Sequence, residues 1–153
     1  MSDLGRHVQT IFCDDVRQEV GNKNSLMGVY AAEMKFSSLP TIVPQLCVLV
    51  QVRTPKDRPI RSLQITVTLG EATLANFIAP PESLPTSAAS VSYFSGLDQD
   101  DELGCLSIGA AFHIMGFSVA IPGAVRVHVI ADGEKLVAQG LHITGPDVLP
   151  AEL

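Results

Sequence analysis

Residues 123–143 read GAVRVHVIADGEKLVAQGLHI, and this stretch decides the fold. Three valines alternate with polar residues before Asp132-Gly133, a pair that supplies the two positive-φ positions of a type I′ turn. A two-residue turn between alternating runs predicts a β-hairpin with a fixed register. The predicted cross-strand pairs are Val129 with Leu136, Val127 with Ala138 and Val125 with Gly140.

The same period-two alternation recurs along most of the chain, with almost no helical periodicity. Besides the hairpin, we predict strands at 8–12, 26–36, 45–53, 62–69, 73–78 and 105–115, with a further short strand or a crossover at 88–94. Seven to nine short strands predict an all-β fold, an antiparallel β-sandwich of the Ig-like or C2-like kind. The length of 153 residues predicts one domain spanning 1–153.

Two connections and one strand allow more specific predictions. The proline-flanked turn at 55–59 predicts that the strands at 45–53 and 62–69 are adjacent and antiparallel. In the second of these strands Val67 belongs to the apolar face and Thr66 to the wetted face. The polar segment 14–25 reads as a turn region, in which only 14–20 offers a turn or so of helix.

Composition narrows the function classes. The chain is 46% hydrophobic and 17% charged, which favours a compact fold over disorder. Its net charge of −6 disfavours direct binding of nucleic acid. All of this net charge falls in 62–125, which contains no Lys or Arg and six acidic residues: Glu71, Glu82, Asp98, Asp100, Asp101 and Glu102.

The cysteines and the N-terminal residues predict the cellular compartment of the protein. Cys13, Cys47 and Cys105 each lie in a strand-like run without a CxxC motif, which favours buried thiols in a reducing compartment. The N-terminus lacks a signal sequence, and no apolar run is long enough for a membrane span. We therefore expect a soluble cytoplasmic protein that does not bind membranes.

Nothing in the sequence has the spacing of a catalytic or metal site. His7, Cys13 and Asp14-Asp15 have the composition of a thiol nucleophile with its base and an acid. However, six residues of extended strand separate His7 from Cys13 by about 20 Å. His113, His128 and His142 are too far apart for metal-ligand spacing and would meet only through tertiary contacts. We expect no catalytic residue, cofactor or metal ligand, and leave calcium binding by the acidic cluster open.

Two segments are candidate partner-binding surfaces. The long irregular segment 80–103 contains Asp98, Asp100, Asp101 and Glu102, which would dock a protein with a basic surface or serve only as a solvated connection. Arg17, Glu19 and Lys23 belong to a polar segment that reads either as an exposed recognition loop at one end of the sandwich or as a local salt-bridged connection.

The run 12–30 also carries a resemblance. It reads FCDDVRQEVGNKNSLMGVY and resembles a family of small, functionally uncharacterised proteins of bacteria and phages. Members carry a D-x-x-R-x-E stretch, then G-K-x-S-L-x-G-V-Y/F, and end in a D-G hairpin like that at 123–133. This chain departs by one inserted residue, Asn22. The resemblance implies a β-sandwich of unknown function and brings no catalytic residue with it.

The sequence therefore predicts a non-enzymatic protein-binding or assembly module. One alternative is a phage-encoded inhibitor of a host defence complex, acting through its acidic surface in the host cytoplasm. Another is a small hydrolase with an unrecognised site, which requires His, Cys and Asp side chains to converge. Ser107, Gly109 and Ala111 form a small-residue face, covered either by another part of the chain or by a second subunit in a homo-oligomer.

Overall fold

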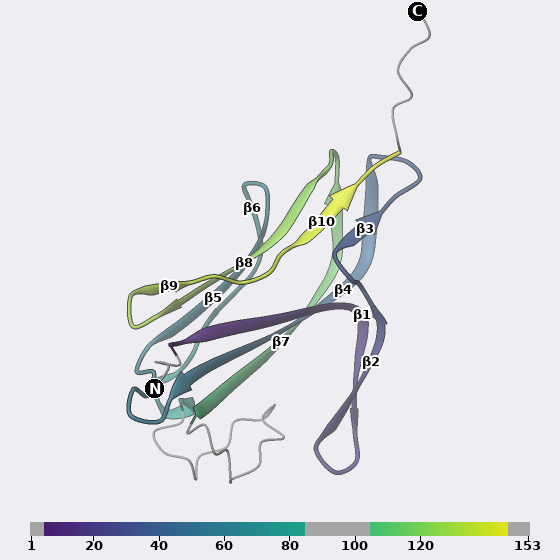
Figure 1. Cartoon of the computed structure of the whole chain (residues 1–153). Helices are drawn as coiled ribbons and strands as arrows, with labels where there is room; N and C mark the ends of the chain where they lie inside the picture. Colours follow the sequence, from purple (N-terminus) through teal and green to yellow (C-terminus); the bar gives the residue numbers. More distant parts are fainter. Residues whose placement is uncertain (1–4, 85–104, 147–153) are drawn as a thin grey trace, which may run out of the picture.

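The computed structural model of the chain describes residues 5–84 and 105–146 (Figure 1). In this part of the chain ten strands form a four-stranded sheet, in the order β2-β1-β4-β7, and a six-stranded sheet, in the order β3-β10-β8-β5-β6 with β9 paired to β8. The bounds of the strands are β1 His7–Glu19, β2 Lys23–Val29, β3 Glu33–Lys35, β4 Thr41–Pro55, β5 Leu63–Leu69, β6 Ala72–Ile78, β7 Cys105–Val119, β8 Gly123–Ala131, β9 Glu134–Leu136 and β10 Leu141–Thr144. The all-β sandwich is confirmed, although the described residues form ten strands rather than seven to nine, and β3 runs parallel to β10.

Aliphatic side chains fill the space between the two sheets. Every second residue of β4 from Leu46 to Val52 is buried, and the same alternation runs through β5 and β8. In β5, Val67 is fully buried and Thr66 is only half-buried, so the predicted assignment of its two faces is confirmed. Among the described residues no helix is long and apolar enough to cross a membrane; the only helical segment is a single turn, Pro81–Ser83.

The predicted hairpin forms at its turn but not along its whole length. Asp132 and Gly133 have φ values of 50° and 80°, as a type I′ turn requires, and Val129 pairs with Leu136. Beyond Leu136 the chain leaves β8, and it returns as β10 with Leu141 opposite Val125. The predicted pairing of Val125 with Gly140 is therefore wrong by one residue.

The segment 137–140 explains this shift in register. The Thr10 hydroxyl of β1 donates a hydrogen bond of 2.6 Å to the Gln139 carbonyl, so the segment is held toward the opposite sheet. Gly140 then passes so close to β8 that a Cβ atom there would lie 2.8 Å from the Val125 carbonyl oxygen. The extra residue that this detour uses places Leu141 and Ile143, both 1% exposed, in the core.

The predicted adjacency of the strands around 55–59 is also wrong. β4 lies between β1 and β7, whereas β5 lies between β8 and β6 in the other sheet. The connection carries the chain across the core with Ile60 buried beneath it, and the Thr54 hydroxyl donates to the Arg58 carbonyl at 2.6 Å. Both strands have a strongly apolar face, and packing the two faces against each other buries both.

Two further expectations for the N-terminal third require correction. The strand predicted at 26–36 is split, because β2 ends at Val29 and β3 belongs to the other sheet. The polar segment 14–25 is neither an extended turn nor a helix: β1 continues to Glu19, and β2 begins at Lys23. The turn itself is only 20–22, where the inserted Asn22 (φ 58°) follows Gly21 (φ 84°).

The second half of β1 forms, with β2, a projecting hairpin. β1 pairs with β4 only as far as Cys13 and with β2 from Cys13 onward. Figure 1 shows β1 bending where it leaves β4 and continuing alongside β2 away from the two sheets. We call residues 14–29 the β1–β2 arm.

Two sequence predictions lie outside the described residues: the acidic residues from Asp98 to Glu102 and the candidate strand at 88–94. The segments that are not described are 1–4, 85–104 and 147–153.

Candidate functional site

The β1–β2 arm carries all three of the predicted site residues that the structure describes. Glu19 pairs with Lys23 across the ladder and Arg17 pairs with Ser25, and the side chains of the three predicted residues are exposed. Local contacts hold part of this surface, because Ser25 donates to Glu19 at 2.9 Å. At the tip Val20 is 94% exposed. The arm thus exposes Val20 at its tip, next in sequence to Glu19, together with the charged side chains of Arg17 and Lys23.

The base of the arm is fixed by Asp14. The Tyr30 hydroxyl donates a hydrogen bond of 2.6 Å to Asp14 Oδ1. Burial and this hydrogen bond raise the pKa of Tyr30 to about 12. Gly28 has φ +65° and passes so close that a Cβ atom would lie 2.1 Å from Asp14 Oδ2, so no other residue fits there without displacing the carboxylate. The arm is therefore held at its base, and beyond Cys13 its strand β1 pairs with β2 but not with β4.

Beside this base, cross-strand register brings reactive side chains together on one face of the four-stranded sheet. Cys13 pairs with Cys47 on β4, and Cys47 pairs with His113 on β7, which puts the three in one row. In the neighbouring row Asp15 of β1 lies beside Gln45 of β4. We call Asp15, Cys47 and His113 the Asp–Cys–His cluster.

The contacts within the Asp–Cys–His cluster are close. Cys47 Sγ lies 3.2 Å from His113 Nδ1, and one ligand atom from each of the three residues lies within 4.8 Å of the others. The Gln45 amide donates both to Asp15 Oδ1 at 3.1 Å and to Cys47 Sγ at 3.4 Å. Cys47 is fully buried, Asp15 is half-buried and His113 is exposed.

Cys13 is a buried thiol, as the sequence predicts. It donates to the Asp15 carbonyl at 3.5 Å. Burial raises the pKa of Cys13 to about 11, and the charges of Cys47, Asp14 and Asp15 add to this. The cysteine is therefore protonated at neutral pH and is a poor nucleophile. His7, which the sequence also suggested, lies opposite Arg53, six residues along β1 from Cys13, so the two do not meet.

Sequence reasoning missed the Asp–Cys–His cluster. Cys47 and His113 are 66 residues apart, and only the pairing of β4 with β7 brings them together. The alternation did place both on strands, but no sequence signal fixed which strands are neighbours or in which register. The convergence of Cys, His and Asp that a hydrolase requires does occur here, on residues other than His7 and Cys13.

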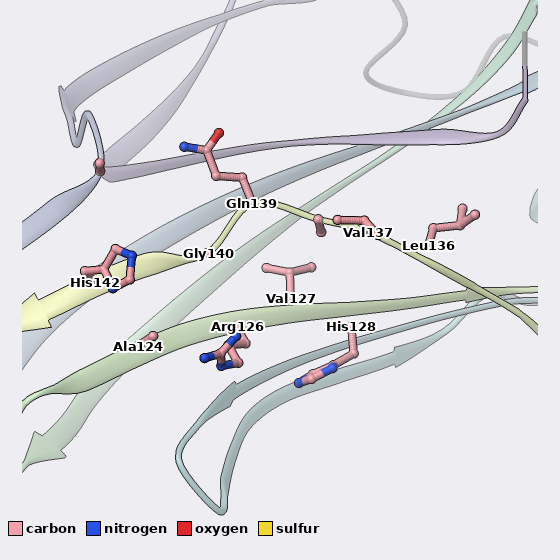
Figure 2. Close-up of a pocket in the computed structure, with 11 residues that line it drawn as sticks. Ala124, Arg126, Val127, His128, Leu136, Val137, Gln139, Gly140 and His142 are labelled. Carbon is pink, nitrogen blue, oxygen red and sulfur yellow. The ribbon is translucent and has the colours of Figure 1, made fainter.

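A separate cavity opens where the C-terminal hairpin is interrupted. It has a volume of about 390 Å³ and lies between β8 and the segment 137–140. Figure 2 shows that Val127 points toward this segment, whereas Arg126 and His128 point away from it. His128 Nε2 lies 3.0 Å from the Thr68 hydroxyl. Arg126 and His128, two of the polar residues that line this cavity, thus point away from the segment on its other side.

Comparisons with known proteins place the chain in a family but give no function. A search of the curated proteins finds no match to the chain. The model of a family of unknown function, DUF6941, matches residues 9–144. The matched region runs from β1 to the end of β10 and includes the β1–β2 arm, the Asp–Cys–His cluster and the interrupted hairpin. The chain therefore belongs to the DUF6941 family of unknown function.

Proposed function

We propose that the protein is a non-enzymatic protein-binding module that docks its partner through the β1–β2 arm. The observation that carries this proposal is the projection of the arm: beyond Cys13, β1 pairs with β2 alone among the described residues, and Val20 at the tip is 94% exposed.

Energetics support this role for the arm. A two-stranded hairpin gains little stability of its own in water. No side chain of 16–26 is buried, so this part of the arm contributes little to the core. An exposed apolar side chain with a charged rim is the composition of a small protein interface. In the arm Val20 supplies the apolar centre, and Arg17, Glu19 and Lys23 supply the rim.

We further propose that Asp98, Asp100, Asp101 and Glu102 favour a partner with a basic surface, because six acidic and no basic residues fall in 62–125. A second copy of the chain is the alternative partner. A heterologous host complex, bound by a phage-encoded inhibitor in the host cytoplasm, is another. We place the protein in the cytoplasm, where its cysteines stay reduced.

Site-specific photocrosslinking in the native cell tests the arm. A photoreactive phenylalanine analogue is placed at Val20 or, as a control, at Val137, which is 93% exposed in the segment after β9. We expect a discrete covalent adduct from position 20 and none from position 137. The mass of that adduct distinguishes a second copy of the chain from another protein. Equal adducts from both positions, or none from position 20, would contradict the proposal.

A hydrolase is the second candidate, because Cys47 Sγ and His113 Nδ1 lie 3.2 Å apart as a nucleophile and its base do. Cys47 is fully buried, however, so a substrate cannot reach its sulfur without rearrangement. Alkylation mapped by mass spectrometry separates the two candidates. A binding module predicts that Cys105, which is half-buried, is modified before Cys47. Preferential modification of Cys47 would favour the hydrolase.

A further inference from the structure

We propose that Asp15, Cys47 and His113 form a binding site for a zinc ion at the base of the β1–β2 arm. The three residues lie on three adjacent strands, β1, β4 and β7, and their ligand atoms approach within 4.8 Å of one another. A thiolate, an imidazole and a carboxylate are the ligand types that Zn²⁺ binds in proteins.

The separation between Cys47 Sγ and His113 Nδ1 is close to that of tetrahedral coordination. With Zn–S and Zn–N bonds of about 2.3 and 2.05 Å, a tetrahedral site places sulfur and nitrogen about 3.6 Å apart. Cys47 Sγ and His113 Nδ1 are already 3.2 Å apart, so this pair needs a shift of only a few tenths of an ångström, and the Asp15 carboxylate, which lies within 4.8 Å of both, approaches them when the ion binds. Three protein ligands leave a fourth position for water or for a group from a partner.

The side chain of Gln45 provides an independent observation. Its amide nitrogen donates to Asp15 Oδ1 at 3.1 Å and to Cys47 Sγ at 3.4 Å. The partially positive amide hydrogens therefore lie between two of the proposed ligands, where a cation would satisfy the same acceptors. Binding of zinc requires Gln45 to rotate away from them. It also displaces one proton from the Cys47 thiol to solvent, while His113 coordinates as neutral imidazole.

The position of the site links it to the arm. Asp15 belongs to the β1–β2 arm, whereas Cys47 and His113 belong to the body of the four-stranded sheet. Asp15 reaches β4 through the hydrogen bond from Gln45. A zinc ion would replace that hydrogen bond with coordination bonds and fix the arm relative to the sheet. Zinc binding at this site does not require any particular partner of the arm.

Titration with Co²⁺, a spectroscopic substitute for zinc, tests the site, followed by competition with Zn²⁺ under reducing conditions. The wild-type protein should develop thiolate-to-cobalt absorption at one equivalent and lose it when zinc is added. Asp15→Asn and His113→Ala should each weaken binding at least about tenfold. Cys47→Ser should abolish the thiolate absorption.

Two control variants sharpen the test. Gln45→Ala should bind at least as tightly as wild type, because it removes the competing donor, and His142→Ala should bind like wild type, because that histidine lies on β10 in the other sheet. Asp15 and His113 are not buried, so their variants fold even where Cys47→Ser does not. Absence of thiolate absorption in the wild type, or unchanged affinity in both Asp15→Asn and His113→Ala, would overturn the site.

Discussion

The carboxylate of Asp132 makes contacts beyond those that its place in the Asp-Gly turn requires. Its Oδ1 accepts hydrogen bonds from the backbone N–H groups of Arg61 and Ser62, at 2.9 and 2.8 Å, where the chain enters β5. Its Oδ2 lies 2.6 Å from the guanidinium of Arg6, a side chain that is only 6% exposed. One carboxylate thus ties together Arg6, which directly precedes β1, the start of β5 and the tip of the β8–β9 hairpin.

Two substitutions at Asp132 separate its roles. Asp132→Ala removes every one of these hydrogen bonds and should lower the free energy of unfolding by about 2 kcal/mol. Asp132→Asn keeps an acceptor for the two backbone groups and tolerates positive φ, so it should cost roughly half as much. Urea denaturation at neutral pH measures both. Equal losses for the two variants would show that the hydrogen bonds to Arg61 and Ser62 contribute nothing.

The same carboxylate predicts a pH dependence. Burial raises the pKa of Asp132, but the hydrogen bonds from Ser62, Arg61 and Arg6 and the charge of Arg6 outweigh it and hold the pKa below its ordinary value. A lowered native pKa stabilises the fold above pH ~4 and loses that contribution as the pH falls through the native value. The stability difference between wild type and Asp132→Asn should therefore shrink below pH ~4 in denaturation series. A difference that stays constant there would contradict the assignment.

At the scale of the elements, the interrupted hairpin shows how one contact changes a register. Gly140 leaves room for the Val125 carbonyl, and the hydrogen bond from Thr10 to Gln139 holds the detour in place. Gly140→Ala should therefore lower the free energy of unfolding by about 1–2 kcal/mol through overpacking against the β8 backbone.

Gly5→Ala is the matched control, because a Cβ atom at Gly5 meets no atom within 4 Å, and it should change stability by less than about 0.5 kcal/mol. Thermal melts of both variants make the comparison. If Gly140→Ala melts like Gly5→Ala, the close approach of Gly140 to β8 is wrong.

The two faces of β5 give a second prediction at this scale. Val67 is fully buried between the sheets, so Val67→Asp places an unpaired carboxylate in the core and should abolish soluble folding. Thr66 lies on the other face, where its hydroxyl donates to Asn76 at 2.9 Å, and Thr66→Asp should be tolerated. Soluble yield and a thermal melt measure the difference. Equal yields would contradict the assignment of the faces.

The sequence predicted those features that depend on local periodicity. It gave the all-β class, the Asp-Gly turn and the faces of β5, because each follows from alternation within one stretch of chain. It could not give the crossing from β4 to β5, since a short connection is compatible with pairing in one sheet and with packing across two. The register beyond Leu136 depends on Thr10, more than a hundred residues away.

Part of the candidate site could likewise be predicted from local periodicity, and part of it could not. Arg17, Glu19 and Lys23 were predicted as exposed residues in a loop, and they are exposed on an arm of two paired strands instead. Charged and neutral residues alternate in the segment that contains them, so this segment has no apolar face from which a strand could be predicted. The Asp–Cys–His cluster depends entirely on which strands are neighbours, which the periodicity of a single strand does not contain.

At the scale of the whole molecule, the two sheets form the body from which the β1–β2 arm projects (Figure 1). Asp14 and Tyr30 hold its base, and the Asp–Cys–His cluster lies beside that base. The buried core lies in the body, and the exposed tip lies at Val20. If the arm docks the partner as proposed, removal of the arm should weaken binding and leave the stability of the core nearly unchanged.

The most direct test of this account is a binding titration with an arm-shortened variant. Replacing residues 16–26 by Asn-Gly joins Asp15 to Met27, which are cross-strand partners, through a two-residue turn and leaves the base of the arm intact. The partner is the one captured by crosslinking at position 20. The account predicts a dissociation constant at least about thirtyfold higher than that of wild type, with a melting temperature within a few degrees of it. Wild-type affinity in the shortened variant would contradict the central claim that the arm docks the partner.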